Sequence, residues 1–429
     1  MNPRLLLPRL QRRLDRLPGQ TRSTLVLWAG AALVGVVAVA LARASEGVFH
    51  GFQALTKQWF WWPLLSLPLG GMLIRWVMQR IGQGAEGSGI PQALAALEQA
   101  QTPLAARLLS GRIALAKFVG IVMGVGSGFV LGREGPTVQI GAALMYACRR
   151  FVPDDVDFSR HLILAGGAAG IAAAFNTPLA GIVFAFEELA HSVEHSTSGR
   201  TIGAVILAGI ISLALLGNYT YFGHIRVPSF NIAILLPMTL VAIGGGLIGG
   251  LFSWLCVHQA RWLPTALSRW RQRHPYLFVA GCGLAIALCG LALPVYGSGA
   301  DETSRAISGQ AELGAAYLPL KFIGLLATFL TGLPGGIFAP SLALGAGLGS
   351  WVAPLFGPDV HIKIIALGMV AMLAGVTRAP ITSAIIMIEM TDGHGMVIST
   401  LGAAMIASGV ARLLFNTHLY RDLSRKFLP

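Results

Sequence analysis

The chain has 429 residues, of which 55% are hydrophobic and only 11% are charged, and its mean hydropathy is +0.69. This composition is too apolar for a soluble enzyme of this length and indicates a protein of the lipid bilayer. The net charge of +13 does not indicate nucleic-acid binding, because the basic residues flank apolar runs and are not interleaved with polar segments.

The N-terminal segment carries six arginines ahead of the first apolar run, Thr24 to Leu41. Positive charge stays on the cytoplasmic side, so we expect residues 1–22 to be a basic cytoplasmic tail and not a cleaved signal. This run and a second one, Ile234 to Cys256, approach the ~20 residues that cross a bilayer. Other apolar runs are shorter and are interrupted by glycine and proline, a pattern typical of broken helices around a midplane site.

Two polar features precede the centre of the first half. In Gly87-Ser-Gly-Ile-Pro91, a helix is predicted to start at Pro91, and Ser88 could either cap that helix or donate to an anion. Lys117 lies in an apolar run, where it could pair with a carboxylate or set the local potential. The four cysteines lack metal-ligand spacing and are expected to be small core residues.

The segment Gly132 to Gly141 places a carboxylate, Glu134, beside a predicted helix start at Pro136. The first N–H groups of a helix have no partner within the helix, and together with the helix dipole they form an anion site. The sequence therefore predicts an anion site here that Glu134 itself could fill.

Three motifs recur in the same order at nearly one offset. Gly132-x-x-x-Pro136 recurs as Gly336-x-x-x-Pro340, and shorter matches relate Gly87-Ser-Gly to Gly297-Ser-Gly and the segment after Pro178 to the segment after Pro380. Three ordered matches predict two homologous halves with a boundary near residue 230.

Charge placement predicts that the halves are inverted. Arginines precede the opening span of the first half, whereas Arg261, Arg269, Arg271 and Arg273 follow that of the second, so the two spans run in opposite directions. We therefore predict an all-α polytopic membrane protein built as an inverted repeat with broken and tilted helices. Residues 23–229 would form the first membrane repeat and residues 230–429 the second.

The repeat also separates two neighbouring carboxylates. Glu187 aligns with Glu389, whereas Glu188 aligns with Met390. A carboxylate present in both halves is more simply explained as part of the shared scaffold, so Glu188 is the candidate for an internal proton site. The nearby His191-Ser-Val-Glu-His195 also fits the H-x-x-E-H pattern of some zinc proteases, although no further ligand is apparent.

The three stretches Gly87-Ser-Gly-Ile-Pro91, Gly132-Arg-Glu-Gly-Pro136 and Gly335-Gly-Ile-Phe-Ala-Pro340 resemble the signatures of the CLC family of chloride channels and chloride/proton exchangers. The resemblance implies a homodimer with one pathway in each subunit. It also implies site residues in three roles: Ser88, Ile337, Phe338 and Tyr420 at the anion site, Glu134 as the gating and external proton glutamate, and Glu188 as the internal proton glutamate.

The resemblance leaves two readings open. The leading one is a chloride/proton antiporter, and the alternative is a passive chloride channel gated by voltage or pH; a second proton-carrying carboxylate distinguishes them. A fluoride-selective relative is disfavoured by Ser88. We expect no enzymatic activity, no metal and no cofactor beyond transported chloride, with chloride, protons and lipid as partners. The expected location is the bacterial cytoplasmic membrane, with both termini in the cytoplasm.

Overall fold

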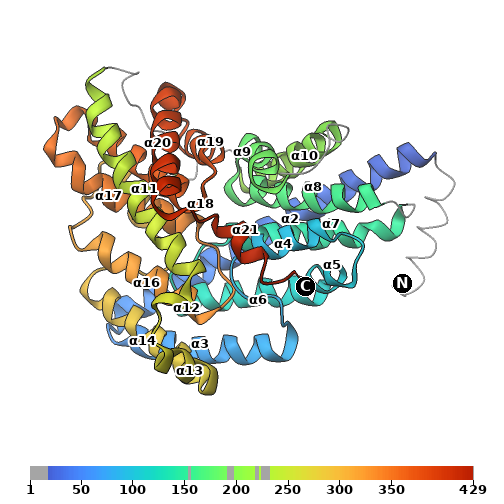
Figure 1. The fold of residues 1–429 in the computed structure, drawn as a ribbon, viewed down its shortest axis with the longest axis horizontal. Helices are drawn as coiled ribbons and strands as arrows, with labels where there is room; N and C mark the ends of the chain where they lie inside the picture. The colour runs from blue at the N-terminus through green and yellow to red at the C-terminus, as the bar shows by residue number, and fades with distance from the viewer. Residues whose placement is uncertain (1–17, 153–155, 191–197, 218–221, 224–231, 429) are drawn as a thin grey trace.

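The computed structural model describes residues 18–428 except for 153–155, 191–197, 218–221 and 224–231, and the described part is a set of helices joined by loops (Figure 1). The first half contains α2 (Gly19–Gln58), α3 (Trp62–Ile81), α4 (Ile90–Glu98), α5 (Pro103–Leu108), α6 (Gly111–Ser127), α7 (Glu134–Ala147), α8 (Val156–Phe175), α9 (Pro178–Phe184) and α10 (Ser198–Leu216). The second contains α11 (Leu235–Val257), α12 (Gln259–Trp262), α13 (Thr265–Arg273), α14 (Pro275–Ala292), α15 (Ala300–Ile307), α16 (Tyr317–Thr331), α17 (Phe338–Val352), α18 (His361–Thr377), α19 (Pro380–Thr391), α20 (Val397–Phe415) and α21 (Leu419–Ser424).

Among the described residues, nine helical segments are long and apolar enough to cross a membrane. The longest helix, α2, has 40 residues and therefore spans about 60 Å, roughly twice the thickness of a hydrocarbon core. It exposes large apolar side chains such as Leu25, Trp28 and Leu33, as expected of a surface in contact with lipid. The predicted boundary of the basic tail at residue 22 lies inside this helix, which begins at Gly19.

Close backbone packing at glycine pairs holds the central helices together. A Cβ atom on Gly141 of α7 would lie 2.3 Å from the carbonyl oxygen of Gly166 in α8. In the second half, a Cβ on Gly345 of α17 would lie 2.4 Å from the carbonyl oxygen of Gly368 in α18. Small residues let helix backbones approach in this way where no hydrophobic effect drives helices together. The same contact therefore appears once in each half.

The helix starts predicted at Pro136 and Pro91 are both slightly wrong. Helix α7 begins two residues earlier, at Glu134, and α4 begins one residue earlier, at Ile90. Proline is tolerated throughout the first turn, because the N–H that it lacks would have no partner within the helix there. Proline thus marks the first turn of each helix but not its first residue, and Glu134 is helical instead of belonging to an unwound approach.

Two glutamates link the halves reciprocally at the N-termini of α9 and α19. The N–H groups of Ile381 and Thr382 donate to Oε1 and Oε2 of Glu187, at 3.0 and 2.6 Å. Reciprocally, the N–H groups of Leu179 and Ala180 donate to Glu389, at 3.1 and 2.7 Å. Each glutamate thereby binds the N-terminus of a helix in the other half. These reciprocal hydrogen bonds confirm the scaffold role that the repeat predicted for Glu187.

The boundary predicted between residues 229 and 230 lies outside the described residues, because residues 224–231 are not described. The division into halves at that point stays a prediction.

The reciprocal capping by Glu187 and Glu389 predicts that the protein loses stability when one of these carboxylates is neutralised. Glu389→Gln should lower the free energy of unfolding by about 1 to 3 kcal/mol, because two backbone donors lose a charged acceptor. The midpoint of thermal unfolding in detergent measures the change. Glu312→Gln, which alters an exposed carboxylate, is the control. Equal midpoints for the two variants would contradict the capping role.

Candidate functional site

Three loops meet where the predicted signature stretches lie. The N–H of Gly132 donates to the carbonyl of Gly336, and the N–H of Gly336 donates back to that of Gly132, both at 2.7 Å. The third loop joins through Gly87, whose N–H donates to Leu333 at 3.2 Å and whose carbonyl accepts from Gly335 at 3.0 Å. These backbone bonds fix the N-termini of α4, α7 and α17 around one point.

The carboxylate of Glu134 occupies the space between these helix N-termini. Its side chain is 0% exposed, and it lies beside the backbone N–H groups of Arg133, Glu134 and Ala339. A Cβ on Gly132 would come within 2.2 Å of its Oε2 atom, so the glycine leaves the space that the carboxylate fills. Neither carboxylate oxygen has a hydrogen-bond partner at a favourable distance and angle among the described residues. The carboxylate thus takes the position that a small anion would occupy.

Ser88 and Tyr420 place two neutral donors close to this point. Helix α4 begins after Gly89, which has a φ of 100°, and the helix has no side-chain cap. Ser88 is therefore not a helix cap, which removes one of its two predicted roles. Its hydroxyl lies close to that of Tyr420, and both residues are buried. Neither hydroxyl has a further hydrogen-bond partner among the described residues, so both can donate to a bound anion.

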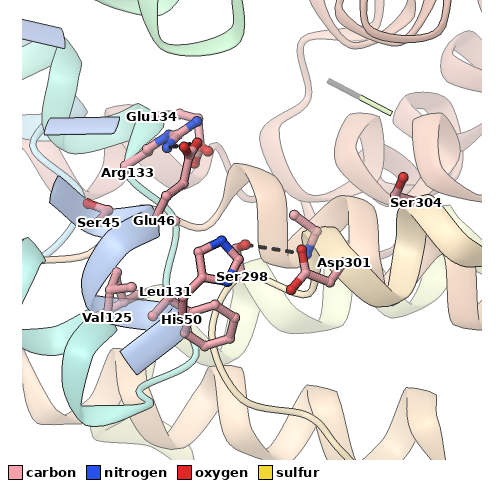
Figure 2. A pocket seen from close by; sticks show the side chains of 13 residues that line it. Ser45, Glu46, His50, Val125, Leu131, Arg133, Glu134, Ser298, Asp301 and Ser304 are labelled. Atoms are coloured by element: carbon pink, nitrogen blue, oxygen red, sulfur yellow. Dashed lines mark hydrogen bonds and ion pairs between the residues drawn. The ribbon is translucent and has the colours of Figure 1, made fainter. Parts of the chain in front are cut away.

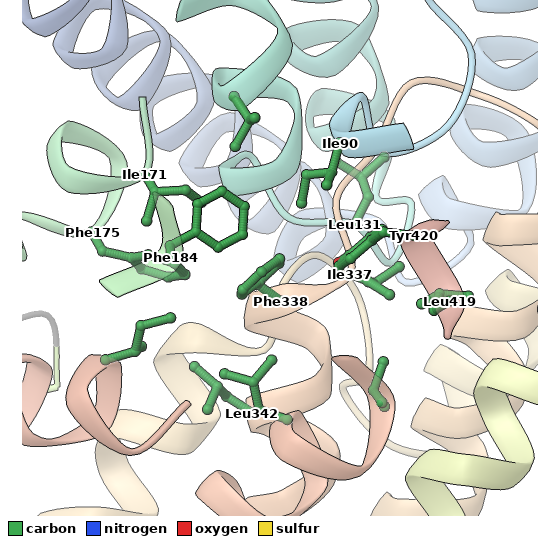
Figure 3. Close-up of a cluster of buried hydrophobic side chains, with 14 of the residues drawn as sticks. Ile90, Leu131, Ile171, Phe175, Phe184, Ile337, Phe338, Leu342, Leu419 and Tyr420 are labelled. Atoms are coloured by element: carbon green, nitrogen blue, oxygen red, sulfur yellow. The ribbon is translucent and has the colours of Figure 1, made fainter. Parts of the chain in front are cut away.

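Aromatic rings pack around Phe338, next to Tyr420 (Figure 3). The ring of Phe338 is stacked on that of Tyr420, with centroids 6.0 Å apart and planes inclined by 10°. Phe175 and Phe184 flank Phe338 at 6.1 and 6.2 Å. Ile337 is the N-cap residue of α17 and Phe338 its first residue, so both place backbone at the helix N-terminus as predicted, while their side chains are buried in this apolar wall.

Two buried lysines support the glycine loops. Lys117 donates to the carbonyls of Ala85, Glu86 and Gly87 at 2.8, 3.3 and 2.8 Å. In the second half, Lys321 donates in the same way to three successive carbonyls, of Val295, Tyr296 and Gly297, at 2.8, 3.3 and 3.0 Å. Lys117 therefore binds carbonyls and not the carboxylate partner that the sequence left open. The equivalent bonds in both halves indicate a structural role in holding each loop.

Two cavities approach the site and are lined by different glutamates. The Glu134-side cavity has a volume of about 260 Å³ and is lined by Glu134, Arg133, Glu46, Ser298 and other residues (Figure 2). The Glu188-side cavity has a volume of about 390 Å³, and the charged and titratable residues that line it are Glu98, Glu187, Glu188, Arg378, His418 and Arg421. The phenol of Tyr420 interacts electrostatically with both Glu134 and Glu188.

The backbone around Glu188 is a single π-helical turn, Ala185–Leu189, that continues α9. Glu188 is 9% exposed, and its neighbour Glu187 is bound to the N-terminus of α19. π-helical turns place successive side chains on different faces from an α-helix and often occur at functional sites. Both glutamates line the Glu188-side cavity, but only the carboxylate of Glu187 binds the N-terminus of α19.

Several residues of the site were not predicted from the sequence. The ion pair of Glu46 with Arg133, 2.9 Å between Oε1 and Nη1, joins α2 to the Glu134 loop. A carboxylate shortly after the apolar run Thr24 to Leu41 was the available signal for Glu46. The resemblance implies only Ile337 and Phe338 as backbone donors on α17, and the structure adds the N–H of Ala339. The H-x-x-E-H pattern at residues 191–195 lies outside the described residues, and the described ones contain no cluster of three potential metal ligands.

Comparison with known proteins identifies the family. Residues 70–412 match the family model described as voltage gated chloride channel. The chain belongs to this family, the CLC family. Its relatives include proteins named H(+)/Cl(-) exchange transporter ClcA. The one from Vibrio vulnificus is 33% identical over 437 residues, covering 93% of this chain and 91% of the relative, and the one from Salmonella paratyphi B is 30% identical over 456 residues, covering 97% and 93%.

Solved CLC structures share the fold. A slow cyanobacterial Cl⁻/H⁺ antiporter aligns with a TM-score of 0.80 at 24% identity, covering 94% of this chain and 97% of the other. A CLC-type fluoride/proton antiporter aligns at 0.77 with 23% identity, covering 94% and 98%. The predicted CLC-like all-α membrane fold is therefore confirmed. As a CLC protein, the chain is a multi-pass membrane protein of a transport family.

The glycine next to Glu134 predicts a test of the anion site. A Cβ on Gly135 would lie 2.3 Å from Oγ of Ser88, so Gly135→Ala should displace that hydroxyl. We expect chloride affinity to fall by roughly tenfold, the equivalent of one good hydrogen bond. Calorimetric titration with chloride measures it. Gly409→Ala, where no atom lies within 4 Å of the new Cβ, is the control, and equal affinities would contradict the role of Ser88.

Proposed function

We propose that the protein exchanges chloride for protons across the bacterial cytoplasmic membrane. The observation that carries this proposal is the fully buried carboxylate of Glu134, lying between the N-termini of α7 and α17 where an anion would bind. The names of the relatives, H(+)/Cl(-) exchange transporters, support the same activity. Chloride and protons are then the partners, and no cofactor beyond chloride takes part.

Neutral donors suit a conducted anion. In the proposal, chloride binds between the hydroxyls of Ser88 and Tyr420 and the backbone N–H groups at Ile337 and Phe338. The ammonium groups of Lys117 and Lys321 donate to carbonyls of the loops, so in the proposal they do not bind the ion directly. N–H and O–H groups replace part of the hydration shell and still allow the ion to leave.

Glu134 is proposed as the gate and the external proton site. When deprotonated, its carboxylate competes with chloride for the helix N-termini. When protonated, it loses that attraction and leaves the position to chloride. Proton and anion therefore alternate at one place, which is the minimum requirement for exchange. The Glu134-side cavity provides a route from that place to water.

Glu188 is proposed as the internal proton site. It lines the Glu188-side cavity, and no carboxylate stands at the equivalent position of the second half. Its neighbour Glu187 is already bound to the N-terminus of α19. Tyr420 lies near both Glu134 and Glu188, so a proton path between the two glutamates would pass the proposed anion site. In this orientation Glu134 faces the outside, and both termini are cytoplasmic. The subunit is proposed to work in a homodimer, each copy with its own pathway.

A passive chloride channel with the same fold is the alternative. It would use the same anion site but would need no titratable group at the Glu188-side cavity. The buried position of Glu188 at that cavity favours the exchanger.

Neutralising the gate predicts uncoupling. Glu134→Gln should abolish proton movement driven by a chloride gradient and leave chloride flux, because the group that binds protons and leaves the anion site no longer titrates. Liposomes carrying the protein, followed with chloride and pH electrodes at once, measure both fluxes. Persistent coupled proton uptake in the variant would overturn the assignment of Glu134.

Neutralising the two neighbouring glutamates should give different results. Glu188→Gln should stop proton transport and leave chloride transport. Glu187→Gln should mainly reduce stability, because its carboxylate binds two backbone N–H groups of α19. The same liposome assay, with a thermal unfolding measurement for each variant, compares them. If Glu187→Gln uncouples transport and Glu188→Gln does not, the two roles are reversed.

A further inference from the structure

Helix α2 forms part of the wall of the Glu134-side cavity, and the proposed exchange assigns no role to the α2 residues there. Its volume of about 260 Å³ is several times the ~30 Å³ of one water molecule, so it can accept the end of a side chain. Glu134 lines this cavity, and Ser45 and Glu46 line it from α2 (Figure 2). The cavity therefore lies next to the side chain that must move in the proposed mechanism.

Ser45 has an unusual hydroxyl. Other hydroxyls on α2, those of Ser23, Thr24 and Thr56, donate to the carbonyl four residues earlier at 2.8 to 3.0 Å. This local bond is the usual one for a helical serine or threonine. Ser45 is only 4% exposed, and its Oγ has no hydrogen-bond partner among the described residues. A buried hydroxyl at a cavity wall is available to a group that enters the cavity.

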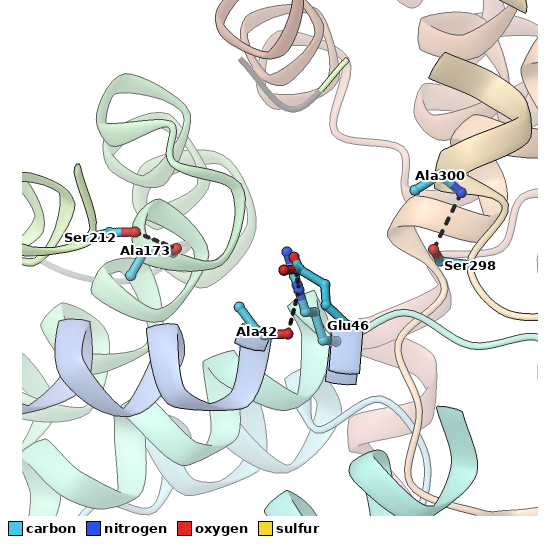
Figure 4. A network of polar contacts seen from close by, with 7 residues as sticks. Ala42, Glu46, Ala173, Ser212, Ser298 and Ala300 are labelled. Carbon is cyan, nitrogen blue, oxygen red and sulfur yellow. Dashed lines mark hydrogen bonds and ion pairs between the residues drawn. The ribbon is translucent and has the colours of Figure 1, made fainter. Parts of the chain in front are cut away.

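Glu46 holds a fixed negative charge beside this hydroxyl. Its Oε1 accepts from Nη1 of Arg133 at 2.9 Å, and the same nitrogen donates to the carbonyl of Ala42 at 3.1 Å (Figure 4). The ion pair neutralises the guanidinium next to Glu134 and keeps it against α2. The side chain of Glu46 is 44% exposed, so it also reaches the water of the cavity.

We propose that Ser45 and Glu46 form a receiving site for the side chain of Glu134 when that side chain is protonated and has left the anion position. This inference rests on the proposed exchange function. A protonated carboxyl donates a hydrogen bond to the carboxylate of Glu46 or to Oγ of Ser45. A deprotonated carboxyl is repelled by Glu46 and returns to the helix N-termini.

The other charged and titratable groups around the cavity agree with this selection. Asp301, at the start of α15, adds negative charge to the wall and accepts from Nε2 of Gln53 at 2.9 Å. His50 is exposed on α2 one turn beyond Glu46. Arg133 is the cation of the wall and is paired with Glu46. The wall therefore favours a neutral carboxyl over a carboxylate, and Ser45 and Glu46 are positioning residues that act through Glu134.

Coupling is the readout that separates this role from a structural one. Ser45→Ala should lower the proton-to-chloride ratio in liposomes by roughly threefold, the scale of one lost hydrogen bond. Glu46→Gln should lower it at least as much, because an amide can bind either protonation state of Glu134. Glu46→Asp, which keeps the charge, should restore most of the ratio. Thr56→Ala removes a hydroxyl that is bonded within α2 and should keep the wild-type ratio.

A second background guards against misfolded variants. Ser45→Ala should leave chloride turnover unchanged when Glu134 is already replaced by alanine, because no carboxyl is left for Ser45 and Glu46 to bind. A wild-type protein that moves no protons overturns the proposed function and this site with it. A coupled wild type whose ratio survives both Ser45→Ala and Glu46→Gln overturns the receiving site alone.

Discussion

Two backbone hydrogen bonds between Gly132 and Gly336 join the halves at the point where their helix N-termini face each other. Each of these glycines lies against the proline of the other half: added Cβ atoms would be 3.2 Å from Pro340 and 3.1 Å from Pro136. In a bilayer an unpaired backbone group is costly, so a loop can exist at this depth only when such bonds satisfy it. The pairing brings the N–H groups at the starts of α7 and α17 together around one point.

Symmetry explains how the frame is built, and departures from it explain what the frame does. Lys117 and Lys321 hold equivalent loops, and Glu187 and Glu389 bind equivalent helix starts. Each of these four charged groups is bound to backbone atoms of the frame. The charges with a proposed transport role, Glu134 and Glu188, have Phe338 and Met390 as their counterparts. An inverted scaffold thus supplies two similar ends, and single carboxylates give them different functions.

Much of this arrangement could be predicted from the sequence, because the three signature stretches and their repeat are local patterns. The resemblance also named Ser88, Glu134 and Tyr420, and these residues lie around one point in the structure. The helix starts were displaced by one or two residues, because proline marks the first turn without fixing its first residue. The partnership of Glu46 with Arg133 could not be predicted, because it joins residues 87 positions apart through the tilt and packing of α2.

In the proposed exchange, the carboxylate of Glu134 and the transported anion use one position. Anomalous diffraction from crystals of Glu134→Gln grown in bromide locates the anion. A bromide peak is expected within hydrogen-bond distance of the backbone N–H groups of residue 134 and Ala339, where the carboxylate now lies. Bromide bound only elsewhere in the pathway, with the residue 134 side chain still buried between the two helix N-termini, would contradict it.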